Sequence, residues 1–399
     1  MALNTLSLAY GVEQNGLMLI ALADGSLAKY PPGGGHWSWF LQYPLGLRAL
    51  GHRVFWFELM PASGDTSLDQ ARIRGFFARV AQYGFERDCA LLVFDPAAPQ
   101  SLEHGEAYGM SIGTLRESIR AADLLWNFCC ALREPLLSAF RRRVLIDVDP
   151  GHLQLCGLHE DLGIHSHQAF LTVGANVHQE DCDIPTLGLK WSAFNPFVYL
   201  PAWPMTPDPG VRAPFTSVTQ WTWEELPYRG RTLSASKRTA YLNYVRLPRL
   251  SMRPFELAAN VGPNDVAGDR AMLTSHGWDL SEPHEVAATP EDYRRFIIRS
   301  RAEILCPKPV FRELHTGWFS DRSVGYLASG RPVLAEETGF SQRLPVGRGI
   351  LSFNNLEEAT AGVAAIDADY TAHQRAAREL AETYFDSRKC LAAMLSASG

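Results

Sequence analysis

Short apolar segments alternate with segments of helical period along the chain, and this alternation limits the fold more than any other feature of the sequence. In the first half the apolar segments are 17–23, 53–59, 89–95, 144–150 and 168–174. Helical segments 36–51 and 68–84 lie between the first of them, and each ends in a glycine, as at a helix C-cap. Strands that alternate with helices form parallel sheets covered by helices on both faces. The sequence therefore predicts an α/β fold.

The alternation stops and restarts near the middle of the chain. Between Phe194 and Phe215, six prolines interrupt any regular element. Beyond them the predicted strands are 215–223, 238–245, 302–308 and 331–337, and the predicted helices are 254–262, 290–301, one after Asp321 and one from Asp369 onward. We therefore predict two doubly wound α/β domains of similar size, divided by the proline-rich segment.

The overall charge and the length of the apolar runs exclude some partners. The 399 residues carry a formal net charge of −6, and no run of five basic residues matches a phosphate backbone. We therefore expect no nucleic-acid partner. The longest apolar run, 17–23, is far shorter than the ~20 residues of a membrane span, and no signal-peptide pattern surrounds it. We expect neither a membrane span nor secretion.

The seven cysteines form no CxxC pair, and the twelve histidines include no HExxH motif. An odd, scattered set of cysteines fits buried thiols in a reducing compartment better than a disulfide framework or a zinc site. We expect a cytoplasmic protein, a monomer or homodimer, without a metal.

A glycine-rich loop follows the first predicted strand. Ligands of open parallel sheets bind beyond the carboxyl ends of strands, where this loop contains Gly34, Gly35, His36 and Trp37. Glycines allow close backbone approach, and an imidazole suits a general base because it titrates near neutral pH. The glycines lack the GxGxxG order of a dinucleotide site. A flexible loop without a ligand explains the same residues equally well.

Three polar residues, Asp147, Asp149 and His152, follow another apolar strand. The alternation of strand side chains puts the two carboxylates on one side, where they can share a proton, hold a cation or orient a sugar hydroxyl. The alternative is that one of them caps the turn before Gly151. We take Asp149 and His152 as catalytic candidates and Asp147 as an acceptor-binding candidate.

Two segments of the second half carry cations suited to a phosphate. Arg246 follows a predicted strand, although a surface arginine is usually only solvated. Lys308 ends another strand, and Ser320 or Asp321 suits the N-cap of the next helix. First-turn N–H groups together with Arg322 would bind a diphosphate well. The alternative is a plain capped helix.

Two segments resemble the GT-B glycosyltransferases. LGLRALGHRVFWFE (45–58) is similar to the first helix and second strand of that fold, and HTGWFSDRSVGYLASGRPVLAEETGF (315–340) resembles its donor-binding region. The resemblance implies two Rossmann-like, doubly wound parallel-sheet domains that face each other across a cleft. Residues 1–205 would bind the acceptor, 206–375 the nucleotide-sugar donor, and 376–399 would form a helix that crosses back toward the first domain.

The resemblance also implies roles for single residues. His36 stands where inverting members carry their base, and Arg246 where the fold often places a phosphate-binding cation. Gly325, counted back from the motif residue Gly330, stands where retaining members carry a ribose-binding glutamate. The catalytic candidates are His36, Asp149 and His152; the donor-binding candidates are Arg246, Lys308, Ser320, Asp321, Arg322, Ser323, Glu337, Thr338 and Gly339; the acceptor-binding candidates are Gly34, Gly35, Trp37 and Asp147.

The implied reaction is transfer of a hexosyl or pentosyl unit from a nucleoside diphosphate donor, such as a UDP-sugar, to a small molecule, natural product or peptide. With His36 as base the reaction inverts the anomeric centre. Cations and helix-end amides would stabilise the leaving diphosphate, so no metal or other cofactor is required. Two alternatives stay open: a sugar-nucleotide epimerase or phosphorylase on the same fold, and a non-catalytic GT-B partner protein.

Overall fold

Two separate parallel sheets divide the molecule into two domains. The computed structural model describes residues 16–262, 265 and 267–399. The first sheet has eight strands, which lie in the order β4 (Glu106–Tyr108), β3 (Cys89–Phe94), β2 (Arg53–Pro61), β1 (Leu19–Asp24), β5 (Leu124–Phe128), β6 (Arg143–Asp147), β7 (Ala169–Thr172) and β8 (Trp191–Ala193). Only β4 runs antiparallel to its neighbour in this sheet.

Helices cover both faces of the first sheet, which is why the residues of β1 from Ile20 to Ala23 have no exposed surface. The helices of this domain are α1 (Gly34–Ala49), α2 (Thr66–Gln82), α3 (Ile112–Ala121) and α4 (His152–Gly157). Short 3-10 turns lie at Leu136–Ala139, Ile164–Ser166 and Leu200–Ala202.

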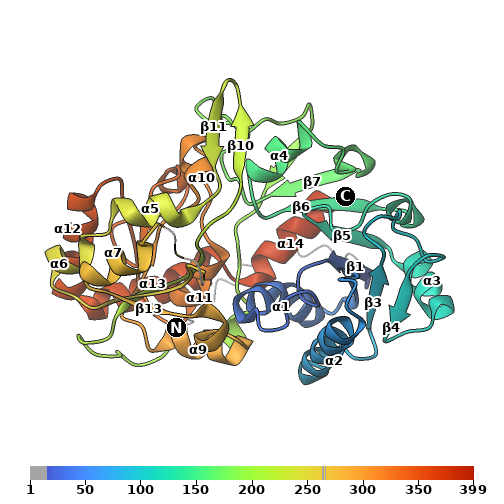
Figure 1. Cartoon of the computed structure of the whole chain (residues 1–399), viewed down its shortest axis with the longest axis horizontal. Coiled ribbons are helices and arrows are strands. Elements are labelled where there is room, and N and C mark those ends of the chain that lie inside the picture. Colours follow the sequence, from blue (N-terminus) through green and yellow to red (C-terminus); the bar gives the residue numbers. More distant parts are fainter. Residues whose placement is uncertain (1–15, 263–264, 266) are drawn as a thin grey trace, which may run out of the picture.

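The second sheet has six parallel strands, which lie in the order β13 (Trp278–Ser281), β12 (Phe255–Asn260), β9 (Phe215–Gln220), β14 (Ala302–Leu305), β15 (Val333–Glu336) and β16 (Ile350–Phe353). The helices that follow these strands are α5 (Lys237–Asn243), α6 (Leu247–Ser251), α7 (Asp269–Ser275), α8 (Pro283–Val286), α9 (Pro290–Ile298), α10 (Pro309–Glu313), α11 (Asp321–Ala328), α12 (Leu356–Ala368), α13 (Tyr370–Tyr384) and α14 (Ser387–Ser398), with a 3-10 turn at Phe340–Gln342. The prediction of two Rossmann-like α/β domains is confirmed, and Figure 1 shows them side by side.

Two element predictions in the second domain were wrong. Segment 238–245, predicted as a strand, forms α5, and its buried residues Lys237, Ala240 and Tyr241 have helical spacing. Segment 254–262, predicted as a helix, contains β12, which pairs with β9 on one side and β13 on the other. A central strand needs small apolar side chains on both faces, and these same residues favour a helix when the sequence is considered alone.

A hairpin that the sequence analysis did not predict extends from the second domain to the first. Strands β10 (Glu225–Tyr228) and β11 (Arg231–Ser234) are antiparallel, and their turn residues Arg229 and Gly230 both have positive φ. The Tyr228 hydroxyl donates to the carbonyl oxygen of Asp183 at 3.1 Å, and Arg229 pairs with the Asp183 carboxylate at 3.0 Å. Figure 1 shows the hairpin beside α4 at the top of the molecule.

The end of the chain returns to the first domain. Helix α14 packs on α1 and β7, and the Trp126 indole donates to the Ser398 hydroxyl at 3.0 Å. Figure 1 shows α14 between the two halves. The predicted domain limits at residues 205 and 375 stay predictions. Within the described ranges, no helix combines the length and apolar character needed to cross a membrane.

The N-terminus of α1 fits tightly against the second domain. The Gly34 amide donates to the carbonyl oxygen of Ala287 at 2.9 Å, and a Cβ at Gly34 would lie 2.3 Å from the carbonyl oxygens of Ala287 and Thr289. The Arg79 guanidinium contacts the carbonyl oxygen of Ala288 at 3.3 Å, and the Tyr83 hydroxyl donates to Glu291 at 2.7 Å. The relative position of the domains therefore depends on the missing side chain of Gly34.

Replacing Gly34 by alanine should separate the domains. The new methyl group cannot coexist with two backbone oxygens at 2.3 Å, so we expect Gly34→Ala to lower the free energy of unfolding by about 1–3 kcal/mol. Small-angle scattering should give a larger radius of gyration than for the natural protein. Gly113→Ala is the control, because a Cβ at Gly113 would meet only the Ser111 hydroxyl at 3.7 Å. Equal stability of the two variants would contradict this account of the interface.

Candidate active site

The carboxyl ends of the two sheets face each other. Asp149 lies just beyond β6 of the first domain, and its carboxylate forms an ion pair with Lys308, which lies beyond β14 of the second domain. Asn176, beyond β7, donates to the carbonyl oxygen of Gly339, beyond β15, at 3.2 Å. The loops that carry ligands in parallel sheets therefore meet between the domains.

Lys237, the first residue of α5, is the least compensated cation between the domains. Its side chain is buried, with 8% of its surface exposed, and the amine lies 5.8 Å from the centre of the Trp318 ring. Burial lowers the pKa of this amine well below its ordinary value, and the nearby charges of Arg322 and Lys308 lower it further. The carboxylates of Asp321 and Glu303 counteract part of this decrease. In the described part of the chain, however, neither forms an ion pair with Lys237, whereas Lys308 and Arg322 each have one. An anionic ligand would supply the missing counter-charge.

Arg322 lies in the first turn of α11 and points to the buried carboxylate of Glu303 on β14. The Nε atom is 3.4 Å from Oε1 of Glu303, whose side chain has no exposed surface. Burial raises the pKa of Glu303, and the Arg322 guanidinium counteracts this rise. Ser320 is the N-cap, and its hydroxyl accepts the Arg322 amide at 3.1 Å. The Ser323 side chain is fully buried behind this turn.

Asp149 connects several charged groups of both domains. Burial alone would raise its pKa, but Lys308 and His152 outweigh that effect and hold the pKa of Asp149 well below its ordinary value. Nδ1 of His152 lies 3.2 Å from the Asp149 carboxylate, and Nε2 lies 2.7 Å from the carboxylate of Glu224. Burial would lower the pKa of His152, but its contacts with Asp149 dominate and raise it. The predicted catalytic pair Asp149 and His152 is thus brought together with Lys308.

Asp147 does not face the cleft, as its predicted role would require. Its side chain has no exposed surface, and it accepts hydrogen bonds from the Asp149 amide, from Gln154 at 2.8 Å and from the Thr172 hydroxyl at 2.7 Å. Burial raises its pKa to about 6. These bonds hold the turn between β6 and α4, so Asp147 positions Asp149 rather than contacting an acceptor.

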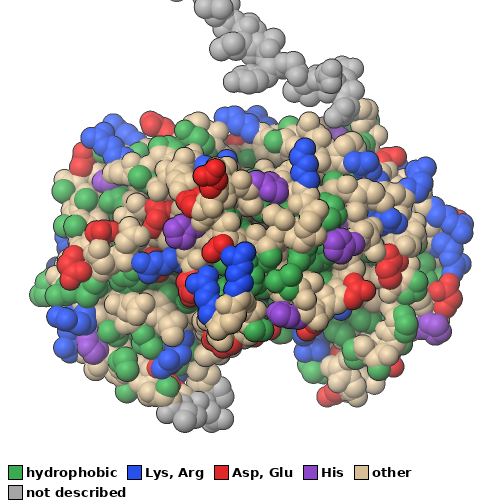
Figure 2. Space-filling model, turned by 90° about the horizontal axis from the view of Figure 1, so that it is seen from above, with side chains coloured by type: hydrophobic (Ala, Val, Ile, Leu, Met, Phe, Trp, Pro, Cys, Tyr) green, Lys and Arg blue, Asp and Glu red, His purple; other side chains and the backbone are tan. Residues whose placement is uncertain are grey.

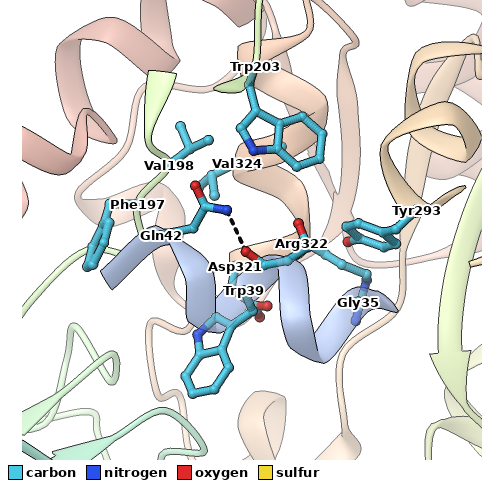
Figure 3. Close-up of a pocket in the computed structure, with 12 residues that line it drawn as sticks. Gly35, Trp39, Gln42, Phe197, Val198, Trp203, Tyr293, Asp321, Arg322 and Val324 are labelled. Carbon is cyan, nitrogen blue, oxygen red and sulfur yellow. Dashed lines mark hydrogen bonds between the residues drawn. The ribbon is translucent and has the colours of Figure 1, made fainter. Parts of the chain in front are cut away.

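A small cavity lies between α1 and α11 (Figure 3). Gly35, Trp39 and Gln42 line it from the first domain, and Asp321 and Arg322 from the second. These positions share one face of each helix, which explains why residues far apart in the sequence surround the same space.

The other candidates of the glycine-rich loop lie elsewhere. Trp37 is fully buried and packs on Trp56 and Phe76, so it belongs to the core and cannot bind an acceptor. Gly34 is buried in the contact with Ala287. His36 is exposed and lies about 110° around α1 from the face that lines the cavity, as the helical period requires. Its charge influences Asp24 at the carboxyl end of β1.

The loop after β15 is held by the first domain. The side chain of Asn176 donates to the carbonyl oxygens of His315 and Gly339. A Cβ at Gly339 would lie 2.5 Å from Nδ2 of Asn176. Glu337 accepts the amides of Thr338 and Gly339, and the Thr338 hydroxyl donates to the Trp318 carbonyl oxygen at 2.6 Å. The polar atoms of this loop are therefore largely bonded within the protein.

Arg246 is far from this group. It is exposed and is the N-cap of α6. The carbonyl oxygen of the preceding Val245 accepts the indole N–H of Trp278, the first residue of β13, so this segment lies at the amino edge of the sheet. The predicted position of Arg246 was wrong because segment 238–245 was taken as a strand. In a parallel α/β sheet, the residue after a strand lies at the carboxyl edge, and the residue after a helix lies at the amino edge.

Sequence reasoning missed three residues of the site: Lys237, Asn176 and Glu224. Lys237 begins a helix, but the β10–β11 hairpin separates it from β9, so it does not directly follow a strand in the sequence. A lysine after Ser-Ala-Ser, a set of residues that favours helix starts, was the available signal. For Asn176 and Glu224 the sequence contains no signal, because each acts only through contact with the other domain.

Comparison with known proteins adds structural relatives only. No family model matches the chain, and no curated protein matches its sequence. Among solved structures, an alpha-glucosyltransferase in complex with UDP-glucose and DNA is similar over 96% of this chain and 100% of its own, with a TM-score of 0.60 and 9% identity. HepE of Anabaena in complex with UDP and glucose is similar over 95% and 99%, with a TM-score of 0.55 and 14% identity.

A glycosyltransferase from Rickettsia africae is similar over 96% of this chain and 98% of its own, with a TM-score of 0.53 and 11% identity. Similarity over the whole length of all three proteins shows that the chain has the GT-B fold. The resemblance that the two sequence segments indicated is thereby confirmed at the level of the fold.

The exclusion of nucleic acid as a partner was wrong. Several of the solved structures with this fold are alpha-glucosyltransferases bound to DNA. The exclusion rested on net charge and on the absence of a basic run, but a ligand responds to the cations at its own binding surface. Figure 2 shows basic and histidine side chains interspersed with acidic ones on the face that is seen from above.

Replacing Lys237 by methionine should stabilise the protein and weaken anion binding. Methionine fills the same space without a charge to bury, so we expect the free energy of unfolding to rise by about 1 kcal/mol. If Lys237 binds the diphosphate of a nucleotide, the Kd for UDP should rise at least about tenfold, since a charged contact would be lost. Chemical denaturation and calorimetry measure the two effects. The exposed Lys389→Met is the control. Unchanged UDP affinity in Lys237→Met would remove this lysine from the site.

The stabilising effect of Lys237→Met should depend on pH. The pKa of Lys237 in the folded protein lies below its ordinary value of 10.5, so between these two pKa values the unfolded state binds more protons. The natural protein therefore gains stability as pH rises through this window. The advantage of methionine should shrink toward pH 10.5, and denaturation curves at several alkaline pH values measure it. If the extra stability of Lys237→Met instead grew with pH, the pKa of Lys237 would not be lowered in the folded protein.

Proposed function

We propose that the protein is a glycosyltransferase that moves a sugar from a nucleoside diphosphate donor, such as a UDP-sugar, to an acceptor. The observation that carries the proposal is the grouping of Lys237, Lys308 and Arg322 beside the N-terminus of α11, at the carboxyl edge of the second sheet. Similarity in fold to proteins solved with UDP-glucose, or with UDP and glucose, supports the same donor class.

The cations and the helix N-terminus would hold the diphosphate. Lys237 lacks a carboxylate partner in the described part of the chain, and Arg322 has an exposed fraction of 15% despite its pairing with Glu303. Arg322 lines the cavity between the domains, and its charge acts on the neighbouring Lys237. Such a group stabilises the negative charge that develops on the leaving diphosphate, and fixed donors cost no reorganisation during the reaction. The proposed transfer therefore needs no metal.

We assign the role of general base to His36. With this base, the reaction would invert the configuration at the anomeric carbon of the sugar. His36 is exposed at the start of α1 and lies near the Asp24 carboxylate at the end of β1, which suits a base open to an acceptor. The small cavity beside Asp321 and Gly35 lies on a neighbouring face of α1. The sugar is a hexosyl or pentosyl unit.

The proposed acceptor is a small molecule, a natural product, a peptide or a nucleic acid, and UDP release with each class would distinguish them. All seven cysteines are free thiols, which supports a reducing compartment such as the cytoplasm.

A donor screen tests the diphosphate site. UDP and UDP-sugars should raise the melting temperature, since a ligand at 100 times its Kd stabilises a protein by about 2.7 kcal/mol. Arg322→Lys keeps a charge opposite Glu303 but loses the planar guanidinium, so we expect about a tenfold lower kcat/KM with the donor. Arg246→Lys is the matched control and should behave as the natural protein. Equal losses in both variants would contradict the assigned location of the donor.

Replacing His36 by alanine tests the base. If His36 takes the acceptor proton, kcat should fall by about 100-fold or more, while the Kd for UDP stays unchanged because the donor binds to the other domain. Nuclear magnetic resonance of the product shows whether the anomeric configuration is inverted. A His36→Ala enzyme with natural kcat, or a product with retained configuration, would refute the role of His36.

A further inference from the structure

A group of possible metal ligands spans the two domains beside the hairpin. His152 and Cys156 come from α4 of the first domain, and Glu224 comes from the segment between β9 and β10 of the second. One ligand atom of each residue lies within 4.8 Å of the other two. His152 and Cys156 are four residues apart, so the helical period puts their side chains on one face of α4. Figure 1 shows α4 directly beside the hairpin that follows Glu224.

The imidazole of His152 is already oriented for a ligand at Nε2. Its Nδ1 atom lies 3.2 Å from the Asp149 carboxylate, while Nε2 lies 2.7 Å from a carboxylate oxygen of Glu224. A histidine that binds a metal usually donates its other ring N–H to a carboxylate, which fixes the ring and makes the ligating nitrogen more basic. Asp149 is itself held by Lys308. The hydrogen-bond partner that orients a metal-binding histidine is therefore present in Asp149, and Lys308 holds that partner in place.

We propose that His152, Cys156 and Glu224 bind one zinc ion that joins the two domains. One nitrogen, one sulfur and one oxygen form a typical zinc ligand set, and the sulfur disfavours magnesium and calcium. Zinc bonds of about 2.0–2.3 Å place tetrahedral ligands roughly 3.3–3.7 Å apart, so small side-chain rotations within the 4.8 Å group suffice. The fourth position is left to water. A thiolate and a carboxylate together balance the charge of the ion.

The ion would act on the arrangement of the domains and not on the transferred sugar. In the absence of zinc, the contact between His152 and Glu224 is a single hydrogen bond, and the Glu224 side chain is half exposed. An exposed pair of this kind contributes little to stability. A zinc ion replaces it with three metal–ligand bonds, two to His152 and Cys156 of the first domain and one to Glu224 of the second. The closed arrangement would then become more stable with the logarithm of the zinc concentration once that concentration exceeds the Kd.

Zinc binding to the full-length protein tests the site. Protein treated with a chelator and then dialysed should bind one Zn²⁺ per chain with a Kd below about 1 µM by calorimetry. Cys156→Ser and Glu224→Gln should each raise that Kd at least about tenfold. Cys182→Ser and Glu225→Gln, at a half-buried cysteine and at the neighbouring glutamate, are the matched controls and should bind as the natural protein. No binding by the natural protein, or equal binding by all five proteins, would overturn the proposal.

Cobalt identifies the ligands directly. Co²⁺ in place of zinc should give a near-ultraviolet thiolate-to-cobalt band in the natural protein and in Glu224→Gln, and none in Cys156→Ser. A band that persists in Cys156→Ser would show another thiol to be the ligand and would overturn the assignment.

Melting temperature and radius of gyration, each with and without zinc, test whether the ion joins the two domains. Zinc should raise the melting temperature and reduce the radius of gyration of the natural protein and of Glu225→Gln. In Glu224→Gln it should raise the melting temperature less and leave the radius of gyration unchanged, because the remaining ligands belong to one domain. If zinc stabilises Glu224→Gln as strongly as the natural protein, the ion binds within one domain and the proposal is wrong. The test is independent of sugar transfer, because no donor or acceptor is present.

Discussion

Unequal charge compensation between the domains is the interaction on which the rest of the site depends. Lys308 pairs with Asp149, and Arg322 pairs with Glu303. Lys237 forms no ion pair in the part of the chain that the structure describes. The nearby carboxylates of Asp321 and Glu303 compensate the charge of Lys237 only in part, so the burial of this lysine costs free energy. Asp149 belongs to the first domain and Lys308 to the second. Closure of the domains and the charge balance around Lys237 are therefore coupled.

The fold followed from the sequence because its pattern reflects burial. Parallel strands are covered on both faces, so they are short and continuously apolar, and the segments around β1, β2 and β3 show this. The same physics explains the failure at β12. Its residues Leu257, Ala258 and Ala259 are compatible with helix or strand, and only the pairing with β9 and β13 decides between them.

Candidates for the site were predicted best where residues directly follow strands. Asp149, Lys308 and the N-cap Ser320 lie at the carboxyl edges of the sheets, as the topology requires. The direction in which a side chain points could not be predicted from the sequence in the same way. Trp37 and Asp147 occupy suitable positions along the chain, but their side chains turn into the core and into a buried hydrogen-bond network. Contacts between domains are set by surfaces that the sequence of one domain does not describe.

The glycine at position 325 is explained by the segment that joins the domains. A Cβ at Gly325 would lie 3.1 Å from the ring of Trp203, which packs edge-on to Tyr293 with centroids 6.4 Å apart. A glutamate at this position would displace the indole, so the interdomain packing and the ribose-binding carboxylate of related folds exclude each other here. Asp321 lies one turn earlier on the same face of α11 and lines the cavity beside Gly325. Asp321 is therefore the carboxylate that α11 brings to the side of position 325.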